Sequence, residues 1–274
     1  MSAYLELLKK SLTASLYEES AWQVIDGPMN DVTGFAAALK RKVVSFLKQR
    51  GLLIVRAKPY QPELREQGLD WPLFGLTMVG MRRLNNVQEC IEDVLAKGIP
   101  GDFVETGVWR GGSSIFAKAV FRQHGADNRA IWCCDSFEGM PAPKATDLLL
   151  QKKSDFSDRD YLAVTEEQVA NNFRKFDLLD ANVKFLKGWF CDTLPTAPIQ
   201  SIAILRMDGD LYDSTMDALK NLYAKVSLGG YVIVDDYKSW RGCRTAVDEF
   251  RKNNKVEDQF VDIDAHAVFW RKTK

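Results

Sequence analysis

The sequence predicts an α/β fold with a doubly wound, mostly parallel sheet, preceded by a helical N-terminal extension. Two observations lead to this prediction. From residue 102 onward, short apolar runs alternate with segments whose apolar residues recur at helical spacing, as in βαβ units. Acidic residues and glycines directly follow these runs, where loops at the carboxyl edge of a parallel sheet would lie. We therefore expect an extension over residues 1–98 and the main domain over residues 99–274.

The N-terminal extension is expected to be mostly helical. Its opening, "MSAYLELLKKSLTASLYEES", is an amphipathic helix pattern broken by charges, so we expect no signal peptide. The stretch "FAAALKRKVVSFLKQRGLL" has helical spacing and ends at Gly51. A further helix, "NNVQECIEDVLAKGIPG", has Asn85 as a candidate N-cap and stops at Gly98, before Pro100.

The main domain contains five apolar runs that we expect to be strands. They read "DFVETG", "AIWCCDS", "VKFLKG", "IAILRMD" and "YVIVDD". The expected helices read "GSSIFAKAVFRQHG", "TEEQVANNFRKFDLL", "STMDALKNLYAKV" and "CRTAVDEFRKN". The second of them begins with a capping box made by Thr165 and Gln168. A terminal apolar run, "FVDIDAHAVFW", completes the series.

Composition excludes several classes of partner. Lysine plus arginine and aspartate plus glutamate each number 37, so net charge gives no reason to expect nucleic acid or anionic membrane. No run approaches the ~18–20 apolar residues of a membrane helix. The five cysteines form no CxxC pair, and with two histidines a zinc site is not expected. We expect a reduced, cytoplasmic, soluble protein that forms a dimer or a tetramer.

Clustered carboxylates end several of the expected strands. Because the carboxyl ends of parallel strands meet at one edge of the sheet, these groups should share the ligand-binding edge. The strand ends are Glu105-Thr106-Gly107, Asp135-Ser136, Gly188-Trp189, Asp208-Gly209-Asp210 and Asp235-Asp236.

The turn "ETGVWRGGSS" after the first strand indicates a nucleotide-type site, although an ordinary βα turn is the alternative. Gly107 allows a tight turn, and Gly111–Gly112 would let a ligand approach the helix N-terminus. The turn is not GxGxxG, and Glu105 disfavours a pyrophosphate while tolerating a cationic ligand with an amino group. Asp135 lies where a ribose-binding acid belongs.

Asp208, Asp235 and Asp236 come from adjacent strand ends, so their carboxylates can converge on one point. Ligation by oxygen alone suits Mg²⁺, Ca²⁺ or Mn²⁺. The alternative is that Asp235 and Asp236 cap a turn and Asp208 is a solvated strand end. Asp210 would face the same cleft, as a general base does.

Five ordered motifs resemble the TylF/macrocin O-methyltransferase family from about Gly75 to Trp270, whereas residues 1–70 contribute little. They are "FVETGVWRGGSSIF", "CDSFEGMPAP", "FLKGWFCDTLP", "LRMDGDLYDSTMDAL" and "LGGYVIVDDYKSWRGCRTAVDEF". The resemblance implies a Rossmann-like class I fold and S-adenosylmethionine-dependent methylation of sugars in natural-product and antibiotic biosynthesis, as in mycinamicin and novobiocin tailoring.

The resemblance also implies roles for individual residues. Asp208, Asp235 and Asp236 would bind Mg²⁺, and Asp210 would be the base. His266 matches no family role, and we expect it to be structural. Cofactor contacts are implied at Thr77, Met78, Glu105, Thr106, Gly107, Arg110, Ser113, Asp135, Ser136, Gly188, Trp189, Phe190 and Asp208.

The first functional hypothesis is Mg²⁺-dependent methyl transfer to one hydroxyl of a vicinal diol on a sugar. A catechol-like acceptor, an NAD-dependent oxidoreductase and a non-catalytic binding module are the alternatives. Glu105 and the missing GxGxxG disfavour the oxidoreductase, and four clustered acids disfavour the binding module. We expect acceptor specificity in the N-terminal helices and in residues 144–160, and we expect residues 144–161 to form a lid rather than an inert insertion.

Overall fold

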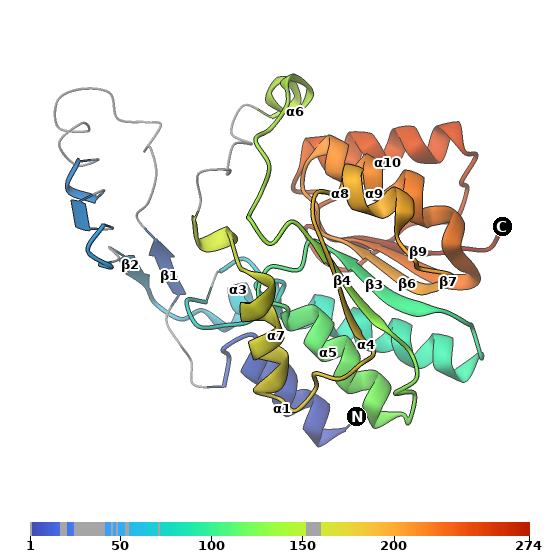
Figure 1. Cartoon of the computed structure of the whole chain (residues 1–274), viewed down its shortest axis with the longest axis horizontal. Helices are drawn as coiled ribbons and strands as arrows, with labels where there is room; N and C mark the ends of the chain where they lie inside the picture. Colours follow the sequence, from blue (N-terminus) through green and yellow to red (C-terminus); the bar gives the residue numbers. More distant parts are fainter. Residues whose placement is uncertain are drawn as a thin grey trace.

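The structure, a computed structural model, describes residues 2–16, 21–24, 42–44, 46–47, 49–52, 55–70, 72–151 and 160–274. Its centre is a seven-stranded sheet of order β5-β4-β3-β6-β7-β9-β8 (Figure 1). Five strands run parallel, and β9 and β8 join antiparallel at one edge. The strands are β3 (Asp102–Thr106), β4 (Ile131–Asp135), β5 (Val183–Lys187), β6 (Ile202–Met207), β7 (Val226–Val234), β8 (Val261–Asp262) and β9 (Val268–Arg271).

Helices cover both faces of the sheet, which confirms the doubly wound class (Figure 1). One face carries α1 (Ala3–Leu12), α4 (Gly80–Ala96), α5 (Gly112–Gln123) and α7 (Glu166–Arg174). The other face carries α8 (Phe190–Thr193), α9 (Tyr212–Leu222) and α10 (Arg241–Asn253). Because both faces are covered, the central strand β6 is buried at every position.

Short segments complete the architecture. The helix α3 (Pro62–Glu66) precedes α4, and α6 (Ala145–Leu150) follows β4. Three 3₁₀ turns, Asp160–Leu162, Leu194–Thr196 and Tyr223–Lys225, lie in the connections. The predicted capping box is present at the start of α7, where the Thr165 hydroxyl accepts from the Gln168 amide at 3.3 Å.

The described part of the N-terminal region contains two short strands where the sequence predicts mostly helix. The strands β1 (Ala21–Val24) and β2 (Val55–Lys58) pair antiparallel. They are four residues each, too short for their pattern to stand out beside the helical spacing that flanks them. Of the helix expected around residues 35–53, residues 42–44 and 46–47 are helical, and 35–41, 45, 48 and 53–54 lie outside the described residues.

The helix α4 begins five residues earlier than its predicted cap. Its N-cap is Val79, and Asn85 lies inside the helix, where its side-chain oxygen accepts from Lys9 Nζ at 2.5 Å. This side chain is therefore used for tertiary contact and not for capping. The predicted end is correct, since α4 stops at Ala96 and Gly98 adopts a φ of 63°.

The N-terminal helices share the core of the main domain. Leu5, Leu8 and Leu12 of α1 belong to the same buried cluster as Ile91 of α4 and Phe116 of α5. The expected boundary after residue 98 therefore does not separate two hydrophobic cores.

The end of α1 also fixes a segment that approaches the ligand edge. The Leu12 carbonyl accepts from the amides of Leu76 and Thr77, at 2.8 and 3.2 Å. The Leu76 carbonyl in turn accepts from the Gly112 amide at 3.0 Å, at the start of α5. Among the described residues, no helix is long and apolar enough to cross a membrane.

Candidate active site

A cavity of about 660 Å³ opens at the carboxyl edge of the parallel strands. Each of the five predicted strand ends contributes to its wall, as expected from the topology of the fold. The residues that do so include Glu105, Asp135, Trp189, Asp208 and Asp236. Other parts of the wall come from residues 76–79, from the stretch between Gly139 and Gln151, and from Ser239, Trp240 and His266.

The turn after β3 depends on glycine in two places. Gly107 has a φ of 86°, and a Cβ there would lie 1.8 Å from the Asp208 carbonyl oxygen. Only glycine lets this turn lie directly against the end of β6. A Cβ on Gly112 would lie 2.5 Å from the Leu76 carbonyl oxygen, so this glycine makes room for the N-terminal segment. The sequence predicts a ligand beside this glycine, whereas in the structure the backbone of Leu76 lies there.

Three non-glycine residues at this edge have left-handed backbone. They are Trp109, Phe137 and Asp210, with φ of 47°, 56° and 55°, in the turns after β3, β4 and β6. Such conformations cost free energy and persist only where surrounding contacts hold them, which is common at functional sites. Three of the six non-glycine residues with such backbone in the described part of the chain thus lie in loops that contribute to the cavity wall.

Asp135 ties two of these turns together. Its Oδ2 accepts from the Val108 amide at 2.6 Å, and its Oδ1 accepts from the Phe137 amide at 2.7 Å. Burial raises the pKa of Asp135, and these amide donors oppose the rise. Asp135, predicted as the ribose-binding acid, therefore joins the turns after β3 and β4 at this side of the cavity.

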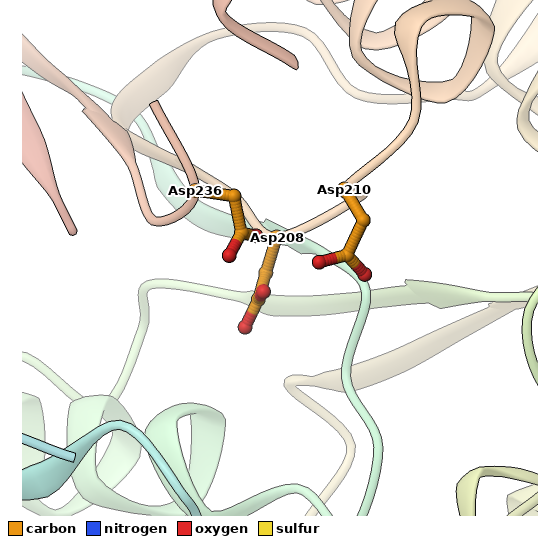
Figure 2. A group of neighbouring side chains, drawn as sticks. All are labelled: Asp208, Asp210 and Asp236. Atoms are coloured by element: carbon orange, nitrogen blue, oxygen red, sulfur yellow. The ribbon is translucent and has the colours of Figure 1, made fainter. Parts of the chain in front are cut away.

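Asp208, Asp210 and Asp236 converge from the turns after β6 and β7 (Figure 2). One carboxylate oxygen of each lies within 4.8 Å of the others. Burial raises the pKa of Asp210 to about 7, with repulsion from Asp208 adding to the effect. Burial likewise raises the pKa of Asp236 well above its usual range, helped by repulsion from Asp210 and Asp208.

This group of three carboxylates fits a divalent cation. The buried Oδ2 of Asp236 has no hydrogen-bond partner within the described ranges. Its Oδ1 accepts from the Ser239 hydroxyl at 3.2 Å. Neighbouring carboxylates that are all ionised repel one another unless a cation lies between them, and oxygen ligands are those that Mg²⁺ prefers.

Asp235 is placed differently from the other predicted metal ligands. Its Oδ1 accepts from Arg206 Nη2 at 2.5 Å, and its Oδ2 accepts from Arg83 Nη1. Asp235 is buried, with 3 % of its surface exposed, so both oxygens are enclosed by this pairing. Asp210, predicted as the base, takes the third place in the carboxylate group.

Arg206 connects the end of β3 to the acidic ends of β6 and β7. Its Nη1 donates to Glu105 Oε1 at 2.6 Å and to Asp208 Oδ2 at 2.9 Å. The guanidinium is fully buried, so these acceptors compensate for the water it has lost. Burial raises the pKa of Glu105 to about 7, against the lowering effect of Arg206 and of the Ser114 hydroxyl.

Arg83 extends this network to the far edge of the sheet. Its Nε donates to Asp264 Oδ2 at 2.7 Å, and that pairing holds the pKa of Asp264 below its usual value although burial opposes it. Asp264 Oδ1 accepts from the amides of His266 and Ala267. Sequence reasoning missed Arg83, Arg206 and Asp264. The available signal was Arg206, a cation inside the otherwise apolar run "IAILRM".

Most of the predicted cofactor residues line the cavity, but three do not. Thr106, Gly188 and Arg110 lie outside its wall. Arg110 instead donates to the carbonyls of Leu73 and Gly75, at 2.6 and 2.8 Å, and so anchors the N-terminal segment. The ten that line the cavity are Thr77, Met78, Glu105, Gly107, Ser113, Asp135, Ser136, Trp189, Phe190 and Asp208.

His266, expected to be structural, also lines the cavity. Its backbone is held at both ends, since its amide donates to Asp264 at 2.8 Å and its carbonyl accepts from the Lys238 amide at 2.8 Å.

The segment expected to be a lid is partly described. Residues 145–150 form the helix α6, which lies beside α10 (Figure 1), and residues 152–159 lie outside the described residues. Lys144, Asp147 and Gln151, in and beside α6, line the cavity.

Comparison with known proteins gives full-length similarities. A sequence model of the family described as Macrocin-O-methyltransferase (TylF) matches residues 1–272. The chain is 43% identical to demethyldecarbamoylnovobiocin O-methyltransferase of Streptomyces niveus, over 100% of this chain and 94% of that protein. It is 45% identical to 8-demethyl-8-(2,3-dimethoxy-alpha-L-rhamnosyl)-tetracenomycin-C 4'-O-methyltransferase of Streptomyces olivaceus, over 98% of this chain and 92% of that protein.

A third relative, mycinamicin III 3''-O-methyltransferase of Micromonospora griseorubida, is 41% identical over 90% of this chain and 99% of its own length. Among solved structures, the O-methyltransferase NovP superposes with a TM-score of 0.83 at 42% identity, covering 99% of this chain and 98% of that chain. The calicheamicin methyltransferase CalS11 has a TM-score of 0.57 at 17% identity, over 90% of this chain and 96% of that chain, and shares the fold.

Proposed function

Since the chain belongs to the macrocin-O-methyltransferase family and is an S-adenosylmethionine-dependent O-methyltransferase, we propose that it is a Mg²⁺-dependent enzyme. In this proposal it methylates one hydroxyl of a vicinal diol on a sugar, carried by a small-molecule natural product such as an antibiotic. Two relatives are named as methyltransferases of a rhamnosyl-bearing compound and of mycinamicin III, which supports a sugar acceptor. The observation that carries the metal part is the buried Oδ2 of Asp236, which has no hydrogen-bond partner in the described part of the chain and lies among three converging carboxylates.

This geometry indicates which residues would hold the cation. Asp208 and Asp236 belong both to the ligand set expected from the sequence and to the carboxylate group. Asp235 can serve as the third ligand only by sharing an oxygen with an arginine, which the second lone pair of a carboxylate oxygen permits. When bound, Mg²⁺ would supply Lewis acidity that makes a coordinated hydroxyl easier to deprotonate.

Asp210 is our proposed general base. A pKa of about 7 lies close to the pH at which proton acceptance is most effective, and the strained turn presents this carboxylate to the same space as Asp208 and Asp236. Proton removal matters because a protonated sugar hydroxyl is a poor nucleophile toward the sulfonium methyl.

The cofactor would occupy the side of the cavity formed by the turns after β3, β4 and β5. Asp135 and Ser136 are the proposed ribose contacts, and Trp189 and Phe190 are the proposed neighbours of the adenine. These four residues line the same cavity, which supports a single orientation of the bound cofactor.

Mass spectrometry with an isotopically labelled methyl donor tests the proposal. The protein is incubated with a panel of glycosides that carry vicinal sugar diols and with catechols, each in Mg²⁺ and in EDTA. We expect labelled sugar ethers in Mg²⁺ only. If only catechols are labelled, the acceptor is catechol-like and not a sugar. Full labelling in EDTA would overturn the metal assignment.

A further inference from the structure

The helix α6 and the residue after it contact the first residues of two other helices. Asp147 Oδ1 accepts from the Tyr212 amide at 2.9 Å, and Tyr212 is the first residue of α9. Gln151 Oε1 accepts from the Arg241 amide at 3.2 Å, and Arg241 is the first residue of α10. These two helices follow β6 and β7, the strands whose ends carry the converging carboxylates. The segment therefore contacts both helices that follow the acidic turns, while Asp147 and Gln151 also line the cavity.

Asp147 is the buried part of this contact. Only 3 % of its surface is exposed, whereas its neighbour Leu149 is 86 % exposed. A Cβ on Gly242 would lie 2.3 Å from Asp147 Oδ1 and 2.9 Å from the Tyr212 nitrogen. The absence of a side chain on Gly242 is thus what leaves room for the carboxylate of Asp147 between α9 and α10. The segment docks through a buried polar contact rather than through its apolar residues.

The contact supplies something that α9 lacks. Its own N-cap residue, Leu211, offers no side-chain acceptor to the first amides of the helix. An acidic side chain is the favoured acceptor at such an end, where the helix dipole also attracts negative charge. Asp147 therefore caps α9 from a different element, some 65 residues away in the chain.

The capped residue lies two positions after Asp210. Between them the Leu211 amide donates to the Gly209 carbonyl in a tight turn, and Asp210 holds its left-handed φ of 55°. A strained conformation of this kind persists only while contacts on either side over-determine it. One side is fixed by β6, and the other side is fixed by the hydrogen bond from Tyr212 to Asp147.

We propose that Asp147 is a positioning residue for methyl transfer: by capping α9 it holds the turn from Gly209 to Tyr212 and so orients Asp210 toward Asp208 and Asp236. The inference rests on the proposed role of Asp210, and Asp147 itself touches no reacting atom. Docking of α6 then does two things at once, since it closes one wall of the cavity and sets the base in place.

The activity of three variants of the protein tests this role. Asp147→Ala should lower kcat by roughly 10- to 100-fold with the KM for S-adenosylmethionine unchanged, because misplacing a catalytic group by about 1 Å costs that much. Asp147→Asn keeps a side-chain oxygen acceptor and should recover most of the rate. Leu149→Ala, on the same helix but exposed, is the matched control and should keep the rate of the unmodified protein.

A second readout does not depend on turnover. Hydrogen exchange at the Leu211 and Tyr212 amides, followed by NMR in the presence of S-adenosylhomocysteine, should be about tenfold faster in Asp147→Ala, the usual effect of losing a cap. Gly242→Ala must displace the Asp147 carboxylate and should give the same change by another route. Circular dichroism checks that each variant is folded.

The outcomes separate the two proposals. Unchanged exchange at Tyr212 in Asp147→Ala, or a kcat equal to that of Leu149→Ala, overturns the role of Asp147. Absence of methyl transfer by the unmodified protein to every glycoside defeats the proposed function instead, and the exchange measurement then still decides whether Asp147 holds the turn.

Discussion

Arg206 Nη2 donates to Asp235 Oδ1 at 2.5 Å in the interior of the sheet, so a cation supplied by the chain is already paired with one of the predicted metal ligands. Together with Arg83, this guanidinium faces Glu105, Asp208 and Asp235. In the described part of the chain, neither Asp210 nor Asp236 forms an ion pair with a lysine or an arginine. Asp210 and Asp236, the two carboxyls that converge with Asp208, therefore have no basic partner among the described residues to offset the burial that raises their pKa values.

Asp236→Asn is expected to abolish turnover and Mg²⁺ binding while the protein keeps its fold. The raised pKa of Asp236 costs stability at neutral pH, because the same carboxyl is ionised in the unfolded chain, so the melting temperature of this variant in EDTA should equal or exceed that of the unmodified protein. Calorimetric titration with Mg²⁺ and differential scanning calorimetry measure the two effects. Tight Mg²⁺ binding by this variant would refute its place in the ligand set.

Asp235→Ala is also expected to abolish turnover. Unlike Asp236→Asn, it should in addition lower the melting temperature, because it breaks a buried ion pair. It leaves Arg206 and Arg83 buried without their shared partner, and removing one member of a buried ion pair costs about 3–5 kcal/mol. Its melting temperature in EDTA should fall well below that of Asp236→Asn. Equal melting temperatures for the two variants would mean that Asp235 acts as a ligand alone.

Asp210→Asn should lower the rate of the chemical step by roughly 10²–10⁴, the usual contribution of a general base. Binding of S-adenosylhomocysteine and of Mg²⁺ should stay nearly intact, because Asp208 and Asp236 remain. Single-turnover kinetics at saturating Mg²⁺ measures the step. Should the variant lose metal affinity and keep its rate at saturating Mg²⁺, Asp210 is a ligand and not a base.

The apo-protein is expected to lose stability as pH rises toward neutrality. The pKa values of Asp210 and Glu105 are raised to about 7, whereas these carboxyls titrate near about 4 in an unfolded chain. Between those values the folded protein binds more protons than the unfolded chain, so the free energy of unfolding falls with pH. Melting temperatures in EDTA should therefore decrease from about pH 5 to pH 8.

The same pH series of melting temperatures, measured in Mg²⁺, is the comparison for the series in EDTA. In the proposed function the cation would bind the ionised carboxylates, so its stabilising effect should grow as pH rises. Asp236→Asn should show neither trend in full. A melting temperature in EDTA that rises across the same range would contradict the raised pKa values.

Asp135→Ala should weaken S-adenosylhomocysteine binding by more than loss of a ribose contact alone would, because Asp135 also joins the turns after β3 and β4 through Val108 and Phe137. Asp135→Asn, which keeps one oxygen acceptor, should bind with intermediate affinity. Isothermal titration calorimetry gives both values. Identical affinities for the two variants and the unmodified protein would remove Asp135 from the site.

The sequence predicts local structure well wherever the signal is local. The five apolar runs are strands, and the capping box at Thr165 is present, because strand periodicity and caps depend on residues a few positions apart. Convergence of the acidic strand ends is also predictable, since it follows from parallel topology.

Features that depend on distant partners could not be predicted in the same way. Asn85 reads as a cap but contacts Lys9, and Asp235 reads as a ligand but meets Arg83, which lies 152 residues away. Arg206 interrupts an apolar run, yet only the sheet shows that Glu105, Asp208 and Asp235 surround it. Pairings of this kind are set by tertiary packing, which no local pattern of residues encodes.

Arg83 belongs to α4, in the N-terminal segment that we expect to govern acceptor choice, yet it binds Asp235 at the catalytic edge. Engineers who exchange this segment between related enzymes to change the acceptor would thereby also exchange a charge that balances the acidic edge. A working chimera therefore has to import an arginine at position 83 together with α4, or bring a compensating change at Asp235 or Asp264. In the proposed function, the acceptor range and the metal site would in this sense be inherited together.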